Sequence, residues 1–410
     1  RGGDFRSVRI SPIALFIEED ASVMPLNKYA AFPSARMEAF YLASRYRDLA
    51  IIDFSTNGHG VYNYGHLMRL APGRAQSAFY SVPLTEVDIA LGNFSRLYTA
   101  AEEAARDGYK NILLLPSSIG SVLGFDFKAY AEDISRVSGV NMFTLPLKLS
   151  DDFYSGREAF LFSMVRFAGK EMSYAESAFN LLGGDATYQA QCDHIYLSVL
   201  IEDSFGLKLN IDSARNERVE AWKHIGNAKI NIVTSRYAVR TAEYLKEKFG
   251  TPYVYIYPLG KAAQDSALRE ISEISGRTFH GERDEIYDFA ALQFSNILRA
   301  EERGVICYTD TDRAQGLKDF LETVGLNPQC YCTHKNGDFP YLALDEVIEK
   351  FHDSNDIVLS CDSVCRQVRC GIPVEYTGIS YDLQVPLRDA RIGTEGAYRL
   401  MGAITKKLLG

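Results

Sequence analysis

Short runs of apolar residues recur along the chain and alternate with longer segments of mixed polarity. Clear runs occupy residues 49–54, 112–116, 230–234 and 253–257. Such runs are typical of parallel strands that are buried on both faces. Between them, segments such as 97–111 repeat their apolar residues with the period of an amphipathic helix. The pattern therefore predicts an α/β protein with doubly wound parallel sheets.

Glycine and proline mark the junctions between helices and the strands that follow. Gly250 and Pro252 stand between a predicted helix that ends at Phe249 and the next strand. Gly accepts a positive φ, and Pro cannot continue a helix. The same order of strand, loop, helix, glycine, proline and strand recurs at Gly371 and Pro373. This repetition predicts three Rossmann-like domains, which we place at residues 1–175, 176–275 and 276–410, the last with a closing C-terminal helix.

The composition narrows the class of protein. The 410 residues are 47% hydrophobic and 24% charged, with a net charge of −9 and a pI of about 5.4. This acidity argues against a nucleic-acid partner, which requires a basic surface. No apolar run approaches the ~20 residues of a membrane helix, and no signal peptide is evident. We therefore expect a soluble, cytoplasmic protein that does not bind membranes.

Seven cysteines are present, an odd number in a large chain, so a disulfide scaffold is not expected. Cys361, Cys365 and Cys370 form a cluster in which the first two, four positions apart, would share one helix face. These three are candidate ligands of a metal or an iron–sulfur cluster, and Cys361 is also a candidate cofactor contact. The alternative is that they are reduced, buried thiols.

Three turns in the first predicted domain carry a resemblance to a known family. They read AFPSA at 31–35, STNGHGVY at 55–62 and PSSIGSVLGFD at 116–126. In order, spacing and flanks they resemble the N-terminal domain of the nitrogenase component 1 superfamily. That superfamily includes the molybdenum-iron protein subunits, the nitrogenase-like protochlorophyllide reductases and cofactor-assembly scaffolds. The resemblance covers most of the chain and implies the three-domain fold.

In that family the turns read roughly CxPxGA, HGxxGC and TCxxxxIGxD, and the cysteines hold an iron–sulfur cluster between two subunits. The matching positions here are Ala31, Val61 and Ser118. Alanine and valine offer no donor atom, and a serine hydroxyl is not ionised at neutral pH. The resemblance thus implies that any iron–sulfur cluster is bound through the complex, by a partner's ligands, or that this paralogue carries none.

The resemblance also implies an activity and partners. Family members pair with a homologous component 1 subunit, as homo- or hetero-oligomers, and receive electrons from an ATP-hydrolysing iron protein. The chain is thus expected to be a subunit of an ATP-dependent reductase of a small-molecule substrate. Alternatives are a non-catalytic cofactor- or tetrapyrrole-binding scaffold or carrier, and a ligand-binding protein of the periplasmic-binding plan. No GxGxxG or GxxxxGK[ST] motif occurs, so we expect no nucleotide on this chain.

Ligands of doubly wound sheets lie beyond the C-terminal ends of the strands, which directs attention to the loops. Gly183 and Gly184 open a predicted helix, where free N–H groups would receive an anion. Ser235 best matches a cofactor-ligating cysteine of the molybdenum-iron proteins. Arg236 next to it is a candidate catalytic and binding residue that would hold an anionic substrate. The alternative is an N-cap serine followed by a solvent-exposed arginine.

His59 is the remaining candidate, as a substitute ligand or proton donor in the second turn. The alternative is a histidine that belongs only to a turn at a subunit interface. We expect a small-molecule cavity where the three domains meet, lined by His59, Gly184, Ser235, Arg236 and Cys361.

Overall fold

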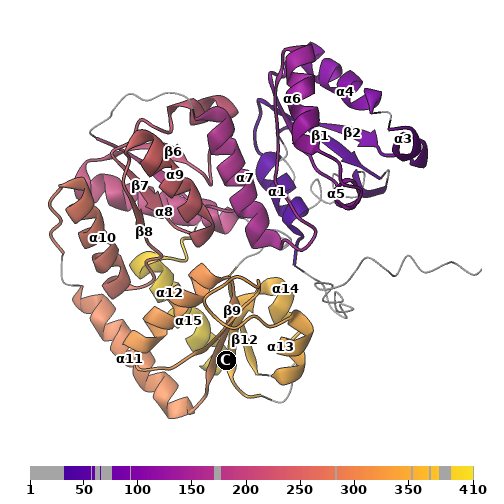
Figure 1. Ribbon diagram of the computed structural model, residues 1–410. Coiled ribbons are helices and arrows are strands. Elements are labelled where there is room, and N and C mark those ends of the chain that lie inside the picture. Colours follow the sequence, from indigo (N-terminus) through magenta and orange to yellow (C-terminus); the bar gives the residue numbers. More distant parts are fainter. Residues whose placement is uncertain are drawn as a thin grey trace, which may run out of the picture.

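The computed structural model contains three four-stranded parallel sheets that follow one another along the chain (Figure 1). In each sheet the strand order is second, first, third, fourth, as in one half of a doubly wound fold. The predicted α/β class with Rossmann-like units is therefore confirmed, whereas the three domain limits remain a prediction. The structure describes residues 32–56, 58–60, 65, 76–92, 94–169, 177–281, 284–351, 354–368, 371–377 and 389–409.

The first sheet has the order β2-β1-β3-β4. Its strands are β1 (Leu49–Ser55), β2 (Ala78–Pro83), β3 (Asn111–Leu115) and β4 (Asn141–Thr144). Its helices are α3 (Glu86–Leu91), α4 (Ser95–Arg106), α5 (Ser118–Val122) and α6 (Phe127–Ser138). All seven residues of β1 are buried, as its apolar sequence predicts for a strand covered on both faces.

The second sheet has the order β6-β5-β7-β8. Its strands are β5 (Ala178–Leu182), β6 (Lys208–Asp212), β7 (Ile230–Val233) and β8 (Tyr253–Tyr255). Its helices are α8 (Tyr188–Phe205), η1 (Val219–His224), η2 (Arg236–Ala238), α9 (Val239–Phe249) and α10 (Lys261–Ser275). Gly250 ends α9 with a φ of +73°, as its place before Pro252 predicts.

The third sheet has the order β10-β9-β11-β12. Its strands are β9 (Val305–Thr309), β10 (Gln329–Cys332), β11 (Ile357–Cys361) and β12 (Ile372–Thr377). Its helices are α11 (Glu285–Glu301), α12 (Thr311–Thr323), α13 (Leu344–Lys350), α14 (Asp362–Cys365) and α15 (Gly393–Leu409). The closing helix α15 packs on α10, α11 and β12, so it joins the second and third sheets.

Two helices join the first sheet to the second. α1 (Ala35–Ala43) packs against α7 (Phe153–Ala168), and α7 in turn contacts η1, η2 and α9 of the second unit (Figure 1). One apolar core runs through this junction, from Leu113 of β3 through Phe160 of α7 to Trp222 of η1. The first two units therefore share a core, and α7 brings its polar residues to the centre of the molecule.

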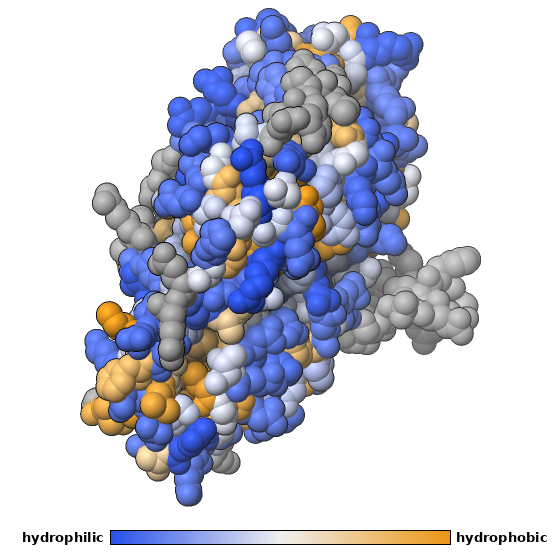
Figure 2. Space-filling model, turned by 90° about the vertical axis from the view of Figure 1, so that its left-hand side faces the viewer, coloured by the Kyte–Doolittle hydropathy of each residue, from blue (hydrophilic) through white to orange (hydrophobic). Residues whose placement is uncertain are grey.

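The outer surface is mainly hydrophilic on the side that carries α10 and α11, with an apolar area towards its lower end (Figure 2). α11 exposes Ile286, Phe289 and Leu292, spaced three residues apart. Among the described residues, no helix is both long enough and apolar enough to cross a membrane.

The packing of α7 on α1 yields a stability prediction. A Cβ added at Gly156 of α7 would clash with the backbone carbonyl of Ala35, whereas one added at Gly402 of α15 meets nothing within 4 Å. Gly156→Ala should therefore lower the free energy of unfolding by about 1–3 kcal/mol. Gly402→Ala should leave it unchanged or raise it by up to ~1 kcal/mol. Denaturant unfolding of both variants checks this, and equal effects would contradict it.

Candidate functional site

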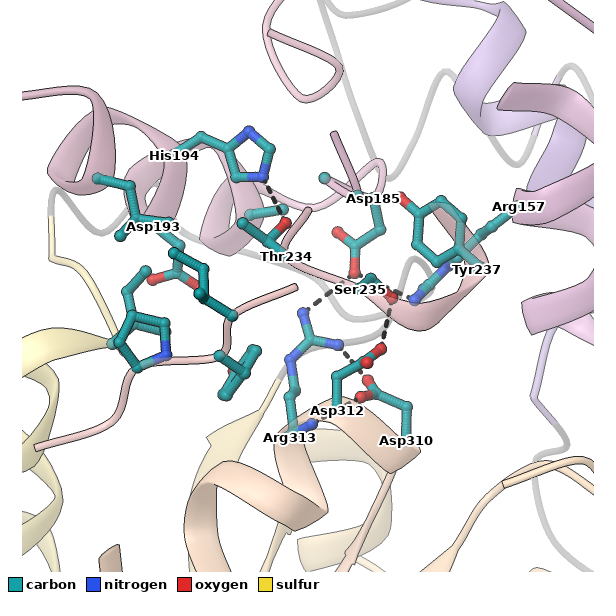
Figure 3. Close-up of a pocket in the computed structure, with 18 residues that line it drawn as sticks. Arg157, Asp185, Asp193, His194, Thr234, Ser235, Tyr237, Asp310, Asp312 and Arg313 are labelled. Carbon is teal, nitrogen blue, oxygen red and sulfur yellow. Dashed lines mark hydrogen bonds and ion pairs between the residues drawn. The ribbon is translucent and has the colours of Figure 1, made fainter. Parts of the chain in front are cut away.

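A small cavity lies where loops of the second and third sheets meet α7 (Figure 3). Its walls come from the loops after β5, β7, β8 and β9, from one face of α8 and from Arg157 of α7. The cavity volume is about 30 Å³, which gives room for a single water molecule. Strand ends of the second and third sheets converge here, and of the predicted lining residues Gly184 and Ser235 are present, whereas His59, Arg236 and Cys361 are not. Charged side chains fill most of the space.

Buried ion pairs tie the three parts of this junction together. Arg157 Nε donates to Glu38 Oε1 of α1 over 2.8 Å, and its Nη1 lies 3.3 Å from Asp185 Oδ2. Asp185 follows β5, and its Oδ2 also accepts from Arg313 Nη2 of α12 at 3.1 Å. Arg313 in addition pairs with Asp310. One carboxylate, that of Asp185, thus joins α7 to the third unit.

The charge on Asp185 depends on these arginines. Burial by itself would raise its pKa, but Arg157 and Arg313 outweigh burial and hold the pKa well below its ordinary value. The hydroxyl of Thr187 also donates to Asp185, at 2.5 Å. Asp185 therefore stays ionised at pH values below the ordinary pKa of an aspartate.

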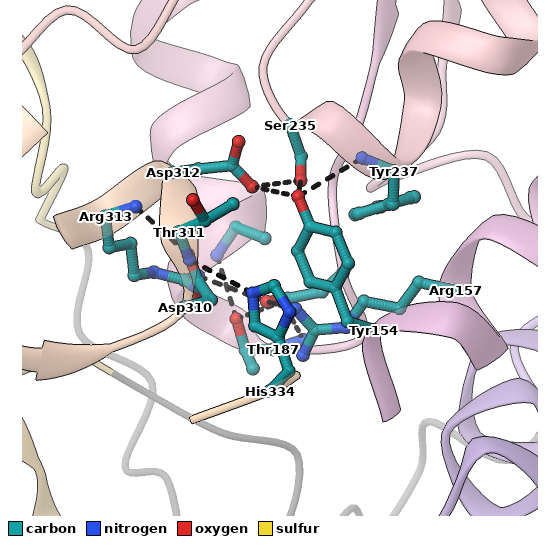
Figure 4. Close-up of polar contacts among 12 residues, drawn as sticks. Tyr154, Arg157, Thr187, Ser235, Tyr237, Asp310, Thr311, Asp312, Arg313 and His334 are labelled. Atoms are coloured by element: carbon teal, nitrogen blue, oxygen red, sulfur yellow. Dashed lines mark hydrogen bonds and ion pairs between the residues drawn. The ribbon is translucent and has the colours of Figure 1, made fainter. Parts of the chain in front are cut away.

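Asp312 is a second buried carboxylate with four neutral donors, two of which, Tyr154 and Ser235, are drawn in Figure 4. Its Oδ2 accepts from the hydroxyls of Tyr154, at 2.7 Å, and Ser235. Its Oδ1 accepts from the backbone N–H of Arg236, at 2.9 Å, and the hydroxyl of Tyr255, at 2.7 Å. Burial and the nearby Asp310 raise the pKa of Asp312 against these bonds. The two buried acids, Asp185 and Asp312, thus have opposite pKa shifts.

His334 stacks against the ring of Tyr154. The two rings stack in parallel with centroids 4.1 Å apart, and the Thr311 N–H donates to His334 Nε2 over 3.2 Å. Because Nε2 accepts a hydrogen bond, the proton of the neutral ring is on Nδ1, which has no protein partner. Burial lowers the pKa of His334, which favours this neutral form.

His194 of α8 forms a separate buried chain of contacts at the same cavity. Its Nδ1 lies 2.6 Å from Asp212 Oδ1, and its Nε2 lies 3.0 Å from Thr234 Oγ1. The half-exposed Arg215 binds the other oxygen of Asp212. These contacts form a continuous series that runs from the half-exposed Arg215 through Asp212 and His194 to Thr234 on the cavity wall.

The glycine turn lies on the cavity wall, but the prediction that its N–H groups are free is wrong. Gly183 and Gly184 both donate to the Ser213 hydroxyl, at 2.9 and 3.0 Å. The following helix has its own cap, because Thr187 Oγ1 accepts from the Ala190 N–H. Ser213 directly follows β6, the strand next to β5 in the sheet. The sequence of the glycine turn itself therefore does not indicate this hydrogen-bond partner.

Ser235 and Arg236, adjacent in sequence, point to different places. Ser235 lies on the cavity wall and is buried. The Arg236 side chain is 43% exposed, pairs with Asp338 and lies over the Tyr255 ring. The backbone N–H of Arg236 donates to Asp312 in the buried network, and its side chain meets that network at Tyr255. Its guanidinium is therefore not among the groups that line the cavity.

The first-domain candidates lie away from the cavity walls. His59 is exposed, with Nδ1 3.0 Å from Thr56 Oγ1. Ser118 is the exposed first residue of α5, and Ala31 and Val61 lie outside the described residues. The buried Asp53 of β1 is paired with Arg36, so its carboxylate already has a cation.

The cysteine cluster differs from the prediction. Cys361 is the last residue of β11 and is buried, whereas Cys365 ends the short α14, so they do not share one helix face. The apolar strand simply continues through Cys361. Cys370 lies outside the described residues. Within the part of the chain that the structure describes, no three His, Cys, Asp or Glu side chains are placed to hold a metal ion.

The charged residues that dominate the site were not among the candidates predicted from the sequence. These are Arg157, Asp185, Asp310, Asp312 and Arg313. One signal was present: three charged residues within four positions directly follow the apolar run of β9, at the end where ligands of parallel sheets lie. Arg157 has no such signal, because it lies within a long helix.

Removal of the central charge should be costly. Asp185→Asn leaves two buried guanidinium groups with one carboxylate fewer, so the free energy of unfolding should fall by about 3–5 kcal/mol. Asp338→Asn removes a half-exposed partner of Arg236 and should cost less than about 1 kcal/mol. Denaturant unfolding at neutral pH compares the two, and similar costs would show that the buried pairs are not coupled to folding.

The same carboxylate predicts a pH dependence. Because the folded pKa of Asp185 is depressed, its contribution is complete above the unfolded pKa of about 3.9 and is lost as the pH falls further. Asp185→Asn should therefore flatten the loss of stability below about pH 4. Asp312 has a raised pKa, so its contribution should instead decline as the pH rises above about 4. Unfolding measured from pH 3 to 7 tests both signs.

Comparisons with known proteins agree with this architecture. Two solved structures of nitrogenase Cp1 align with almost the whole chain. The one at pH 6.5 has a TM-score of 0.75 and 16% identity and covers 96% of this chain and 94% of its own. The one at pH 5 has a TM-score of 0.66 and 14% identity, with 93% and 90% covered. At this identity the likeness concerns the fold.

Curated relatives match shorter segments. A subunit of the light-independent protochlorophyllide reductase of Synechococcus sp. (strain JA-3-3Ab) is 38% identical over 79 residues, 19% of this chain and 15% of the relative. The corresponding subunit of Heliobacterium modesticaldum is 24% identical over 198 residues, 47% of this chain and 38% of the relative. The matches thus span well under half the length of these relatives.

The sequence model of the nitrogenase component 1 type oxidoreductases matches residues 34–364, which is most of the chain and includes all three sheets except β12. This match confirms the resemblance carried by the three turns. The chain belongs to the nitrogenase component 1 type oxidoreductase family.

Proposed function

We propose that this chain is one subunit of a nitrogenase-like component 1 reductase, paired with a homologous subunit that holds the electron-transferring cluster. Electrons come from an ATP-hydrolysing iron protein, and the need for ATP places the complex in the cytoplasm. The substrate is a small molecule. In this assembly the chain contributes its fold and its polar side chains, whereas the thiolate ligands of the cluster come from the partner subunit.

The observation that supports the proposal best is the hydrogen bonding of the Ser235 hydroxyl. This residue best matches a cofactor-ligating cysteine of the molybdenum-iron proteins, and here its hydroxyl donates to Asp312. Tyr154 lies 3.2 Å from the same hydroxyl. A hydroxyl held this way is a poor ligand for a soft metal, which favours thiolate. The family's fold is kept while the ligand has become part of a hydrogen-bond network.

The residues of the first domain do not fit an iron–sulfur cluster of the usual kind. Such clusters are held by cysteine thiolates. Ser118 offers only an exposed hydroxyl, and Ala31 and Val61 have no donor atom at all. Asp53, a buried carboxylate of β1, is engaged by Arg36. The first domain of this chain therefore lacks the thiolates that would hold an electron-transferring cluster.

The central cavity supports a role in handling protons. Reduction of a small molecule consumes protons as well as electrons. Asp312, with its raised pKa, and His194, linked towards the surface through Asp212, are the groups here that could supply them. The cavity of about 30 Å³ holds little more than water, so a larger substrate requires the side chains that line it to move apart.

Because side chains nearly fill the central cavity, a second function is also favoured. In that function the chain is a scaffold or carrier that binds a cofactor or tetrapyrrole without catalysing a reaction. A groove of about 680 Å³ lies between the start of α10, α11 and the end of α12. It has an apolar floor, including Ala291 and Phe320, and is of the size that suits a ligand of several rings. Binding there would leave the central ion pairs intact.

One experiment separates the two functions. The chain is produced with its homologous partner subunit and an iron protein, and reduction of protochlorophyllide is followed with and without ATP. ATP-dependent reduction by the complex supports the reductase. Absence of reduction, together with saturable quenching of protoporphyrin IX fluorescence by this chain alone, would support the carrier instead.

Metal content gives a further prediction. Iron and acid-labile sulfide should appear in the two-subunit complex and should vanish when the partner's cysteines are replaced. Cys361→Ser and Cys365→Ser on this chain should leave them unchanged. Near four irons per chain in the isolated subunit would contradict the proposal.

Association should depend on the second turn of the first domain. The resemblance puts this turn at the subunit interface, where an apolar side chain is buried against the partner. Val61→Asp should therefore weaken association, whereas Val137→Asp, on an exposed position of α6, should not. Sedimentation of the mixed subunits measures it. A monodisperse monomer at micromolar concentration, with no partner captured, would refute pairing.

A further inference from the structure

Two cysteines face each other on neighbouring strands of the third sheet, away from the central cavity. In the register of β9 and β10, Cys307 is the direct partner of Cys330. Neighbouring strands lie ~4.8 Å apart, which is within the Cα separations that a disulfide accepts, about 4.4–6.8 Å. Both side chains belong to the same apolar cluster and so leave the sheet on one face. The backbone therefore already has the spacing that a disulfide needs.

The two thiols are in contact and differ in character. Cys307 is fully buried on a central strand, whereas Cys330 is on β10, an edge strand of the described sheet, and is 9% exposed. A hydrogen bond from the Cys307 thiol lowers the pKa of Cys330 against the effect of burial, and the Lys318 ammonium lowers it further. The contact and burial raise the pKa of Cys307. The Cys330 thiol is thus the better nucleophile, and the Cys307 thiol in contact with it can react in a second step.

We propose that Cys307 and Cys330 form an oxidation site, a dithiol that hydrogen peroxide converts to a disulfide. The Cys330 thiolate attacks one peroxide oxygen, the O–O bond breaks, and hydroxide leaves with a sulfenic acid on Cys330. The Cys307 sulfur then attacks the sulfenic sulfur, the S–S bond forms and the S–O bond breaks. The two thiol protons leave with the two oxygens and two hydrogens of the peroxide as two molecules of water.

The Cys307–Cys330 pair is connected through β9 and α12 to the polar residues of the central cavity. β9 continues from Cys307 into Asp310 within three residues, and Cys330 Sγ donates to the Ala314 carbonyl of α12 over 3.8 Å. A disulfide removes that thiol proton. The site therefore lies beneath the helix that presents Asp312 and Arg313 to the central cavity.

The chain offers a matched control on the same strand. Cys332 is two residues beyond Cys330 and is buried, but its partner in β9 is Thr309, so it has no thiol opposite. Cys332→Ser should therefore leave the reaction unchanged. Cys307→Ser and Cys330→Ser should abolish the cross-link, the former while leaving Cys330 open to sulfenic acid trapping by dimedone.

The test is peptide mapping of the reduced, folded full chain after treatment with a small excess of hydrogen peroxide. The expected result is a linked Cys307–Cys330 peptide that disappears on reduction, with the loss of two thiols titratable in denaturant. Recovery of both cysteines as free thiols, or a linkage of Cys330 to any other cysteine, would overturn the proposal. The unsubstituted chain decides this, so poor folding of a variant does not affect the outcome.

Discussion

The carboxylate of Asp185 between two buried arginines is the interaction on which the rest of the structure depends. A buried charge is costly unless it is paired, and Asp185 is the one carboxylate that pairs with both arginines, each of which has a further acid of its own. Arg157 comes from the helix that joins the first two units, and Arg313 comes from the third. The ion pairs therefore fix how the sheets meet, which apolar packing alone specifies less sharply.

The same pairs determine what the centre of the molecule can do. Arginine and aspartate side chains occupy the space between the strand ends, so a cavity of about 30 Å³ is left. Asp312 differs from Asp185 because its four hydrogen-bond donors are neutral, and its pKa is raised rather than lowered. The site thus combines a fixed charge with an acid whose proton can move, a combination suited to reductive chemistry that needs protons.

Membership of the nitrogenase component 1 family concerns the fold, whereas the proposed function has the family's ligand positions changed in this chain. The alignment with nitrogenase covers nearly the whole chain, yet Ser235 donates to a carboxylate and Ser118 begins a short helix in the open. Fold and site can separate in this way because a sheet needs only apolar strands, whereas a cluster needs particular donor atoms at particular points.

The sequence by itself determined the strands, the helix ends and the family. Apolar runs such as that of β1 allow few structures other than a buried strand, and Gly250 ends its helix through local backbone geometry. The contacts of side chains across the junction were decided only by the tertiary structure. Asp185 and Arg313 are 128 residues apart, and the amides of Gly183 and Gly184 are taken by a serine about 30 residues away. Arg236 and Ser235 are neighbours that point in different directions. Local sequence sets backbone conformation, but the partner of a buried polar group depends on how distant segments meet in space.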